Sequence, residues 1–248
     1  MITLDQLISL LAKARYVAVL TGSGISAESG IPTFRGADGL WKQYRAEDLA
    51  TPEAFRRDPT LVWEWYRFRR DIIRKAEPNP GHDALAEMER LVPNFVLITQ
   101  NVDGLHQRSG SKTVIELHGN IFIDRCVECG REVDRSGQPE PETALPRCEC
   151  GGLFRPGVVW FGEALPAEAL NRAWDAVDQC DIFFSIGTSA LVYPAAGLPD
   201  MARQRGAKVV EINPEKTPIS SRMDLSIRES AAHTLQEIVA KLKAVKAS

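Results

Sequence analysis

Apolar positions along the chain recur in two patterns. Between Leu4 and Leu11 they repeat with the period of a helix, and Thr3 with Gln6 forms a capping box, so we predict an amphipathic helix over residues 3–14. Short apolar runs bounded by turn residues or helical segments are typical of buried parallel strands. These runs occupy residues 17–20, 95–99, 113–117, 181–186 and 208–212.

Helical segments lie between several of these runs. We predict helices over 82–91, 166–179 and 195–205, and a last helix over 234–245. Strands that alternate with helices predict an α/β fold with a Rossmann-like, doubly wound parallel sheet. Two stretches interrupt the alternation: residues 31–80 contain helical material without a strong strand, and residues 126–152 are too polar to build a core.

Composition and charge narrow the class of protein. The 248 residues are 44% hydrophobic and 25% charged, the balance of an ordinary globular protein. A formal net charge of −3 gives no overall attraction to nucleic acid or to anionic membranes. The N-terminal segment has neither a basic n-region nor a cleavage site, and no apolar run has the length of a membrane span. We therefore expect a cytoplasmic protein with no membrane or nucleic-acid partner. We also expect it to be a monomer.

Four of the five cysteines gather in one polar stretch. Cys126 and Cys129 form a C-x-x-C pair, and Cys148 and Cys150 close the group as C-x-C. Four thiolates at this spacing are typical of a closed tetrahedral zinc site, which leaves no position for a reacting water. We predict one structural Zn²⁺ here and expect the fifth thiol, Cys180, to be buried as a small hydrophobe.

A glycine-rich loop directly follows the first predicted strand. Gly22, Gly24 and Ala27 give the arrangement G-x-G-x-x-A, whose backbone can approach a pyrophosphate at a helix N-terminus, although a plain glycine turn would give the same letters. In an ordinary dehydrogenase a helix and a second strand follow. Here Pro32 and nearby glycines stop the helix early, which predicts a different use of a dinucleotide.

Polar residues follow two further predicted strands, at the edge of a parallel sheet where ligands bind. Asn101 and Asp103 come after the strand at 95–99 and suit a ribose and a carboxamide, but an Asx turn would explain them as well. His118 closes the strand at 113–117. A histidine in that place can act as a general base near neutral pH. From the residues alone, a structural histidine is the commoner case.

Taken in order, these motifs resemble the signatures of the sirtuin family. The matching segments are GSGISAESGIPTFR at 22–35, TQNVD at 99–103, LHG at 117–119, VVWFGE at 158–163, GTS at 187–189 and INPE at 212–215, together with the paired cysteines. The resemblance covers nearly the whole chain. It implies a single catalytic domain with a large Rossmann-like part at about 1–30, 82–120 and 153–248. A small module would comprise a helical segment at about 31–81 and a zinc-binding segment at about 121–152.

The resemblance also implies a reaction. A sirtuin consumes NAD as a co-substrate: the acyl oxygen of an acyl-lysine attacks the nicotinamide ribose, and nicotinamide leaves. A histidine then deprotonates a ribose hydroxyl, which attacks the resulting imidate. The products are free lysine, nicotinamide and O-acyl-ADP-ribose. Acyl-lysine-bearing proteins would bind as extended peptides in the cleft between the two parts.

Carried over to this chain, the family roles fall on matching residues. His118 would be the base, Asn101 would position the ribose and a water, and Asp103 would hold the nicotinamide carboxamide. Further NAD contacts are implied for Gly22, Ser23, Gly24, Ala27, Glu28, Thr33, Phe34, Arg35, Trp41, Gln100, Val102, Gly187, Thr188, Ser189, Asn213, Pro214, Glu215 and Ala231. The peptide would pair, as an added strand, with Val158, Phe161, Gly162 and Glu163. Ser23 replaces the usual alanine and Val102 the usual isoleucine, and neither departure threatens the assignment.

One predicted helix bears on the acyl group. Asp58 can cap it, and Tyr66 and Arg69 then lie three residues apart on one face. A guanidinium beside a phenol suits a short dicarboxylic acyl group, and Tyr-x-x-Arg resembles the desuccinylase and demalonylase branch of the family. We expect removal of succinyl, malonyl or glutaryl groups, with acetyl removal retained. The alternative is a surface helix whose tryptophans cover the core while its arginines face water.

Two other functions stay open at this point. An NAD-dependent protein ADP-ribosyltransferase shares every step up to the loss of nicotinamide. A zinc-ribbon nucleic-acid module is a non-enzyme alternative. Its loop, however, opposes arginines such as Arg131 and Arg147 with acidic residues such as Glu128 and Glu149, and this near-balance of charge disfavours phosphate binding.

Overall fold

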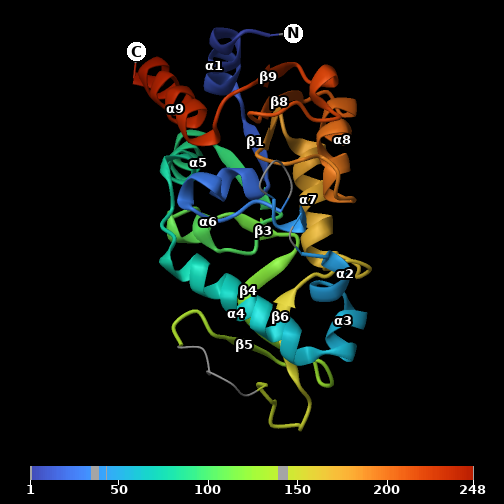
Figure 1. Ribbon diagram of the computed structural model, residues 1–248. Helices are drawn as coiled ribbons and strands as arrows, with labels where there is room; N and C mark the ends of the chain where they lie inside the picture. The colour runs from blue at the N-terminus through green and yellow to red at the C-terminus, as the bar shows by residue number, and fades with distance from the viewer. Residues whose placement is uncertain (1, 35–38, 43, 139–144, 248) are drawn as a thin grey trace.

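The computed structural model describes residues 2–34, 39–42, 44–138 and 145–247. The chain folds into a large α/β part and a second, smaller packing unit that lies below it in Figure 1. No helix within the described ranges combines the length and the apolar character that a bilayer span requires.

A six-stranded parallel sheet forms the centre of the large part, which confirms the predicted fold class. Its strands, in spatial order, are β3 (Val114–Glu116), β2 (Asn94–Thr99), β1 (Tyr16–Thr21), β7 (Ile182–Ile186), β8 (Lys208–Ile212) and β9 (Leu225–Ile227). The five predicted strands are present within one residue of their expected bounds. The sixth, β9, was not predicted, because its three half-buried residues form no apolar run.

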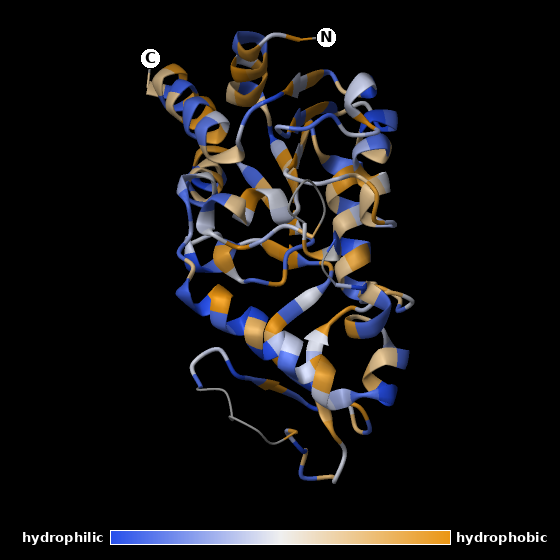
Figure 2. Ribbon diagram, in the orientation of Figure 1, coloured by the Kyte–Doolittle hydropathy of each residue, from blue (hydrophilic) through white to orange (hydrophobic). Residues whose placement is uncertain are grey.

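Helices cover both faces of this sheet (Figure 1). One face packs against α1 (Leu4–Lys13), α5 (Pro80–Leu91) and α9 (Ala231–Ala247). The other packs against α7 (Ala167–Gln179) and α8 (Leu198–Gln204), which follows the short 3₁₀ helix η3 (Ala195–Gly197). The helices are striped with apolar and polar residues in Figure 2, as amphipathic helices on a sheet should be. The helix predicted over 195–205 is divided at Gly197 because Pro199 occupies the first turn of α8.

Capping side chains set where helices begin. The predicted capping box of α1 is present: Thr3 accepts a hydrogen bond from the Gln6 backbone, and the Gln6 side chain accepts one from the Thr3 backbone. Asp58 likewise accepts from the Leu61 N–H at the start of α4 (Pro59–Lys75). The sequence therefore marks these two boundaries directly.

The smaller unit joins helices to a three-stranded antiparallel sheet. Its helices are α2 (Ala46–Leu49), α3 (Pro52–Arg57) and α4, and its strands, in spatial order, are β5 (Glu132–Asp134), β4 (Gly119–Cys126) and β6 (Phe154–Val158). Short elements elsewhere are η1 (Ser23–Ser29), η2 (Leu40–Lys42), α6 (Leu105–Arg108) and η4 (Ser220–Arg222).

The sequence places residues from about 153 onward in the large part, but the first of these residues pack in the small unit. Strand β6 pairs with β4, and Phe154 and Trp160 lie in one apolar cluster with Trp63 and Tyr66 of α4. The segment that follows the zinc loop therefore packs with the small unit rather than with the large part. The described part of the polar stretch 126–152 builds no core of its own, as expected, because α4 supplies the apolar side chains.

Helix α4 is fastened to the second sheet by two buried side chains. Arg70 donates to Asp124 Oδ1 at 2.8 Å and to the Ile121 carbonyl at 2.6 Å, and its guanidinium lies 5.2 Å from the centroid of the Trp63 ring. Trp63 Nε1 donates to the Phe154 carbonyl at 3.0 Å. Breaking a buried ion pair by removing one partner costs about 3–5 kcal/mol, so this anchor fixes the position of α4.

Candidate active site

The carboxyl ends of β1, β2 and β7 meet at one edge of the sheet, and their loops are joined through the backbone. The Gly22 N–H donates to the Ile186 carbonyl at 3.0 Å, and the Gly24 N–H donates to the Gly187 carbonyl at 2.8 Å. A Cβ atom on Gly24 would lie 2.7 Å from Gly187 Cα, so the two loops can approach this closely only as glycines. The helix after the glycine loop is the single 3₁₀ segment η1, which confirms that it stops early.

Asn101 and Asp103 lie beside this loop and contact Ser26. The Asn101 side-chain amide donates to Ser26 Oγ at 3.1 Å and to the Gly22 carbonyl at 3.2 Å. Ser26 Oγ donates to Asp103 Oδ2 at 2.8 Å. Asp103 is buried, and burial raises the pKa of its carboxyl group, while hydrogen bonds from Leu105 and Ser26 act in the opposite direction. Ser26 was given no individual role from the sequence, although it lies inside the glycine motif.

His118 lies between β3 and β4, with its ring held by the β2 loop. Nδ1 is 3.0 Å from the Gln100 carbonyl oxygen, which can only accept, so Nδ1 carries the proton. The other ring nitrogen, Nε2, is then an unprotonated acceptor and has no hydrogen-bond partner among the described residues. Burial lowers the pKa of His118, which keeps the imidazole neutral near pH 7. This arrangement suits a group that accepts a proton.

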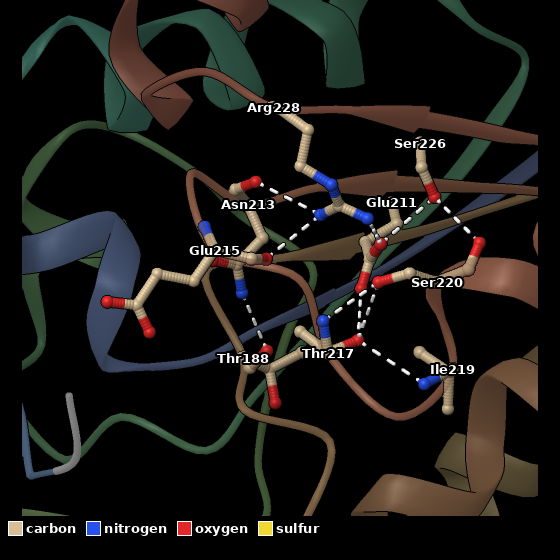
Figure 3. Close-up of polar contacts among 9 residues, drawn as sticks. All are labelled: Thr188, Glu211, Asn213, Glu215, Thr217, Ile219, Ser220, Ser226 and Arg228. Atoms are coloured by element: carbon tan, nitrogen blue, oxygen red, sulfur yellow. Dashed lines mark hydrogen bonds and ion pairs between the residues drawn. The ribbon is translucent and has the colours of Figure 1, made fainter.

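The loops after β7 and β8 form a connected surface on the other side of the sheet edge. Gln100 Nε2 donates to Thr188 Oγ1 at 3.1 Å, and Asn213 Nδ2 donates to the Thr188 carbonyl at 2.8 Å. The Glu215 N–H donates to Asn213 Oδ1, and the Glu215 carboxylate points away from the network (Figure 3). These backbone and amide groups can bind the hydroxyl groups of a sugar.

A buried carboxylate holds the β8 loop in place (Figure 3). Glu211 accepts from Thr217, from Ser226 Oγ at 3.0 Å and from Arg228 at 2.7 Å. Arg228 also donates to the carbonyls of Asn213 and Glu215 at 3.2 and 2.9 Å. Burial alone would raise the pKa of Glu211, but these hydrogen bonds lower it below its ordinary value, so the group is ionised at neutral pH.

Tyr66 and Arg69 point inward from α4, so the alternative of a surface helix with solvated arginines is wrong. Arg69 is 9% exposed, and its guanidinium lies 4.7 Å from the ring centroid of Phe34 and 5.7 Å from that of Tyr66. Asp103 is near enough to influence its pKa, yet none of the described carboxylates lies within ion-pair distance of it. A small pocket beside Arg69 is lined by apolar residues that include Phe68.

The segment after β6 turns rather than continuing as a strand. Strand β6 ends at Val158, and residues 161–163 form a turn in which Glu163 accepts from the Trp160 N–H at 2.8 Å. Glu163 also accepts from Arg155 at 2.9 Å, so its carboxylate has a partner within the chain. Phe161 is 43% exposed, and Gly162 adopts a positive φ of 87°. Of the expected peptide-binding strand, only Val158 lies in a strand.

The remaining predicted cofactor residues include Glu28, Val102 and Ala231. Glu28 accepts from the Ala232 N–H at 3.2 Å, next to the buried Ala231 at the start of α9. Val102 is buried in the cluster of the small unit. Arg35 lies outside the described residues, and so does the side chain of Trp41. Of the other predicted NAD contacts, Ser23 and Ala27 lie in η1 and Thr33 follows it, whereas Ser189 and Pro214 lie in the loops after β7 and β8.

The four clustered cysteines come together at the far end of the small unit. Their sulfur atoms all lie within 4.8 Å of one another, with Cys126–Cys150 at 3.5 Å and Cys129–Cys148 at 3.7 Å. A tetrahedral zinc ion with Zn–S bonds of about 2.3 Å separates its ligands by about 3.8 Å, so the set fits this metal. The Cys129 N–H lowers the pKa of the Cys126 thiol to about 6, which favours a thiolate ligand. Cys180 lies apart and is buried, as predicted.

Comparison with known proteins gives consistent matches. A family model described as the Sir2 family matches residues 22–194. An NAD-dependent protein deacylase of Aquifex aeolicus is 59% identical over 223 residues, which cover 90% of this chain and 93% of the relative. A solved Sir2 homologue in complex with NAD is 47% identical with a TM-score of 0.92, covering 98% and 94% of the two chains. A Sir2 complex with a p53 peptide and NAD⁺ is 32% identical with a TM-score of 0.85, covering 98% and 100%.

Proposed function

The chain belongs to the Sir2 family, and on this basis we propose that it is an NAD-dependent protein-lysine deacylase that removes succinyl, malonyl or glutaryl groups and also acetyl groups. The observation that carries the acyl assignment is the buried guanidinium of Arg69, which has no carboxylate partner among the described residues.

A buried guanidinium is costly when, as here, no carboxylate among the described residues forms an ion pair with it. Burial lowers the pKa of Arg69, which means that its surroundings disfavour the isolated charge. An acyl chain that ends in a carboxylate would bring the missing partner, and a planar guanidinium can bind a carboxylate through two parallel hydrogen bonds. Tyr66 stands beside it, and burial raises the pKa of its phenol, which therefore stays protonated and able to donate. An acetyl group has no such carboxylate and would bind without this contact.

We assign the chemistry of deacylation to His118. NAD is a substrate that loses nicotinamide when the acyl oxygen attacks the ribose. Nε2 of His118, which is unprotonated in the tautomer set by Gln100, then takes a proton from a ribose hydroxyl so that its oxygen can attack the imidate carbon. Acyl-lysine, NAD⁺ and water thus give lysine, nicotinamide and O-acyl-ADP-ribose.

Other residues would bind and orient the two substrates. We propose that Asn101 positions the ribose and a water, and that Asp103, held by Ser26, binds the nicotinamide carboxamide. The glycine loop would contact the phosphates through Gly22, Ser23 and Gly24, with Phe34 and Arg35 nearby. The adenosine half would lie against Gly187–Ser189, Asn213–Glu215 and Ala231. The remaining contacts proposed for NAD are those of Ala27, Glu28, Thr33, Trp41, Gln100 and Val102.

The protein substrate would bind at the end of β6. Val158 offers the last strand position, and the exposed ring of Phe161 with Gly162 and Glu163 forms the turn beyond it. A related Sir2 structure contains a p53 peptide, which supports a peptide substrate for this chain. Backbone pairing of this kind tolerates many sequences, which suits an enzyme with several protein substrates.

A comparison of two substrates tests the proposal. We expect Arg69→Met to lower kcat/KM on a succinyl-lysine peptide by about two orders of magnitude, since removing one member of a buried charge pair costs about 3 kcal/mol. Activity on the acetyl-lysine peptide should stay within about threefold. Arg67→Met, two positions away on the same helix, is the matched control and should change neither rate.

The outcomes separate the alternatives. Equal losses on both peptides in Arg69→Met would show that Arg69 is not the carboxylate ligand. Mass spectrometry of the products should find O-acyl-ADP-ribose. A protein that gains ADP-ribose instead would support the transferase reaction.

A further inference from the structure

We infer that Trp160 is a positioning residue for acyl specificity, because its indole N–H fixes the phenol of Tyr66 as a donor toward the acyl carboxylate. This inference rests on the proposed function and extends it to a residue that lies in the VVWFGE segment but received no role of its own from the sequence. Trp160 acts through Tyr66 and not through its own contact with the acyl group.

The hydrogen-bond inventory of the two side chains carries the inference. Trp160 Nε1 lies 2.9 Å from Tyr66 Oη, and both side chains are buried. An indole N–H can only donate, so the phenol oxygen must accept this bond. The single phenol proton is then directed elsewhere, and none of the described residues accepts it. An incoming carboxylate, which only accepts, is the partner that this proton lacks.

The indole itself cannot easily turn away. The residues on either side of Trp160 are fixed by backbone hydrogen bonds of 2.9 Å, from Val159 to the His118 carbonyl and from Phe161 to the Ala50 carbonyl. Arg155 lies over the indole with its guanidinium carbon 3.4 Å from the ring centroid, and Phe55 packs against it at 5.4 Å. The Trp160 donor is therefore part of a preorganised site.

Charge strengthens the same arrangement. Arg155 is in turn held by Glu163 at 2.9 Å and by the Val158 carbonyl at 2.8 Å. A cation against the face of an indole makes its N–H a better donor, and each bond in a chain of hydrogen bonds polarises the next. The phenol that accepts from this indole becomes a stronger donor to an anion. Such an effect is specific to acyl groups that carry a carboxylate.

The test is a double-mutant cycle on two peptides. Trp160→Phe removes the N–H but keeps a ring of similar shape, and Tyr66→Phe removes the hydroxyl. We expect Trp160→Phe to lower kcat/KM on the succinyl-lysine peptide about fivefold, mainly through KM, and to change acetyl activity by less than twofold. In the Tyr66→Phe background the same substitution should cause no further loss of the succinyl-to-acetyl ratio.

A matched control separates positioning from packing. Trp63→Phe deletes an indole N–H in the same apolar cluster, but that N–H donates to the Phe154 carbonyl and not to Tyr66. It should lower Tm by an amount similar to Trp160→Phe and leave the substrate ratio unchanged. An equal loss on both peptides in Trp160→Phe, or an undiminished loss in the Tyr66→Phe background, would overturn the inference while the acyl assignment stands. A parent protein without activity on succinyl-lysine would overturn both.

Discussion

Nδ1 of His118 faces the backbone carbonyl of Gln100 at 3.0 Å, and this contact decides which ring nitrogen can act as a base. Gln100 follows β2, whereas His118 precedes β4, so the tautomer is set across two elements of the sheet edge. The side chain of the same residue, Gln100, donates a hydrogen bond to Thr188 on the β7 loop. Gln100 thereby joins the proposed base and the proposed dinucleotide-binding loop in one hydrogen-bonded network.

The pH profile of the reaction should follow this histidine. Only neutral His118 can accept a proton, and burial lowers its pKa, so the active form persists to a more acidic pH than for a free imidazole. We expect kcat/KM to rise with pH and to level off with a midpoint below 6.5, the ordinary value for histidine. His118→Ala should lower deacylation by about 10²–10⁴-fold.

Nicotinamide exchange provides the control for that variant. In the proposed order of steps the base acts after nicotinamide has left, so His118→Ala should still exchange labelled nicotinamide into NAD when an acyl peptide is present. Loss of exchange together with deacylation would show that His118 is needed for substrate binding, and an acid midpoint above 7 would contradict a neutral buried base.

Removal of zinc should disable the small unit. Cys126 and Cys148 belong to the same apolar cluster as Tyr66 and Trp160, so loss of the metal should loosen the acyl pocket as well as the cysteine loop. We expect about one zinc ion per chain, and we expect Cys148→Ala to lose both the metal and activity on all acyl peptides. Elemental analysis and rate measurements check this.

The fifth cysteine offers a matched control for the zinc experiment. Cys180 is buried on the far face of the large sheet and lies outside the thiol cluster. Cys180→Ala should therefore keep its zinc and its activity. An active Cys148→Ala protein without zinc would mean that the four thiols need no metal to hold the small unit.

Arg228 should affect NAD binding more than turnover. It ties Glu211 to the carbonyls of Asn213 and Glu215, so Arg228→Met frees the β8 loop that we place against the adenosine half. We expect KM for NAD to rise about tenfold, with kcat within twofold, because no group near the reacting atoms changes. Arg222→Met removes an exposed arginine paired with Asp200 and should leave KM unchanged. A fall in kcat at constant KM would exclude the proposed role.

Much of the fold was predictable because the large part obeys simple periodicity. The strand at 181–186 and the helix capped by Thr3 follow from local patterns that the structure reproduces. The small unit was harder to predict from the sequence, because β6 pairs with β4, which lies some thirty residues away along the chain. A buried strand of five residues that contains Pro156 and Gly157 has no strong local signal.

The candidate site likewise has a part that the sequence predicts and a part that it does not. Glycine spacing and the residues after strands identified where Gly22, Asn101 and His118 would lie, because strand ends converge at one edge of a parallel sheet. The hydrogen bond from Trp160 to Tyr66 joins residues 94 positions apart. Whether an indole donates to a phenol or to a carbonyl, as Trp63 does, depends on tertiary packing that no single-sequence pattern contains.

On helix α4, the side chains that attach the helix to the second sheet are different from those proposed to contact the acyl group. Trp63 and Arg70 fasten it to the second sheet, whereas Tyr66 and Arg69 face the proposed acyl group from neighbouring positions on the same helix. The two tasks fall on different side chains, so the pair at 66 and 69 can be exchanged without loosening the anchor. Under the proposed function, this makes acyl preference a property that a protein engineer, or gene duplication followed by drift, can change while the rest of the enzyme stays the same.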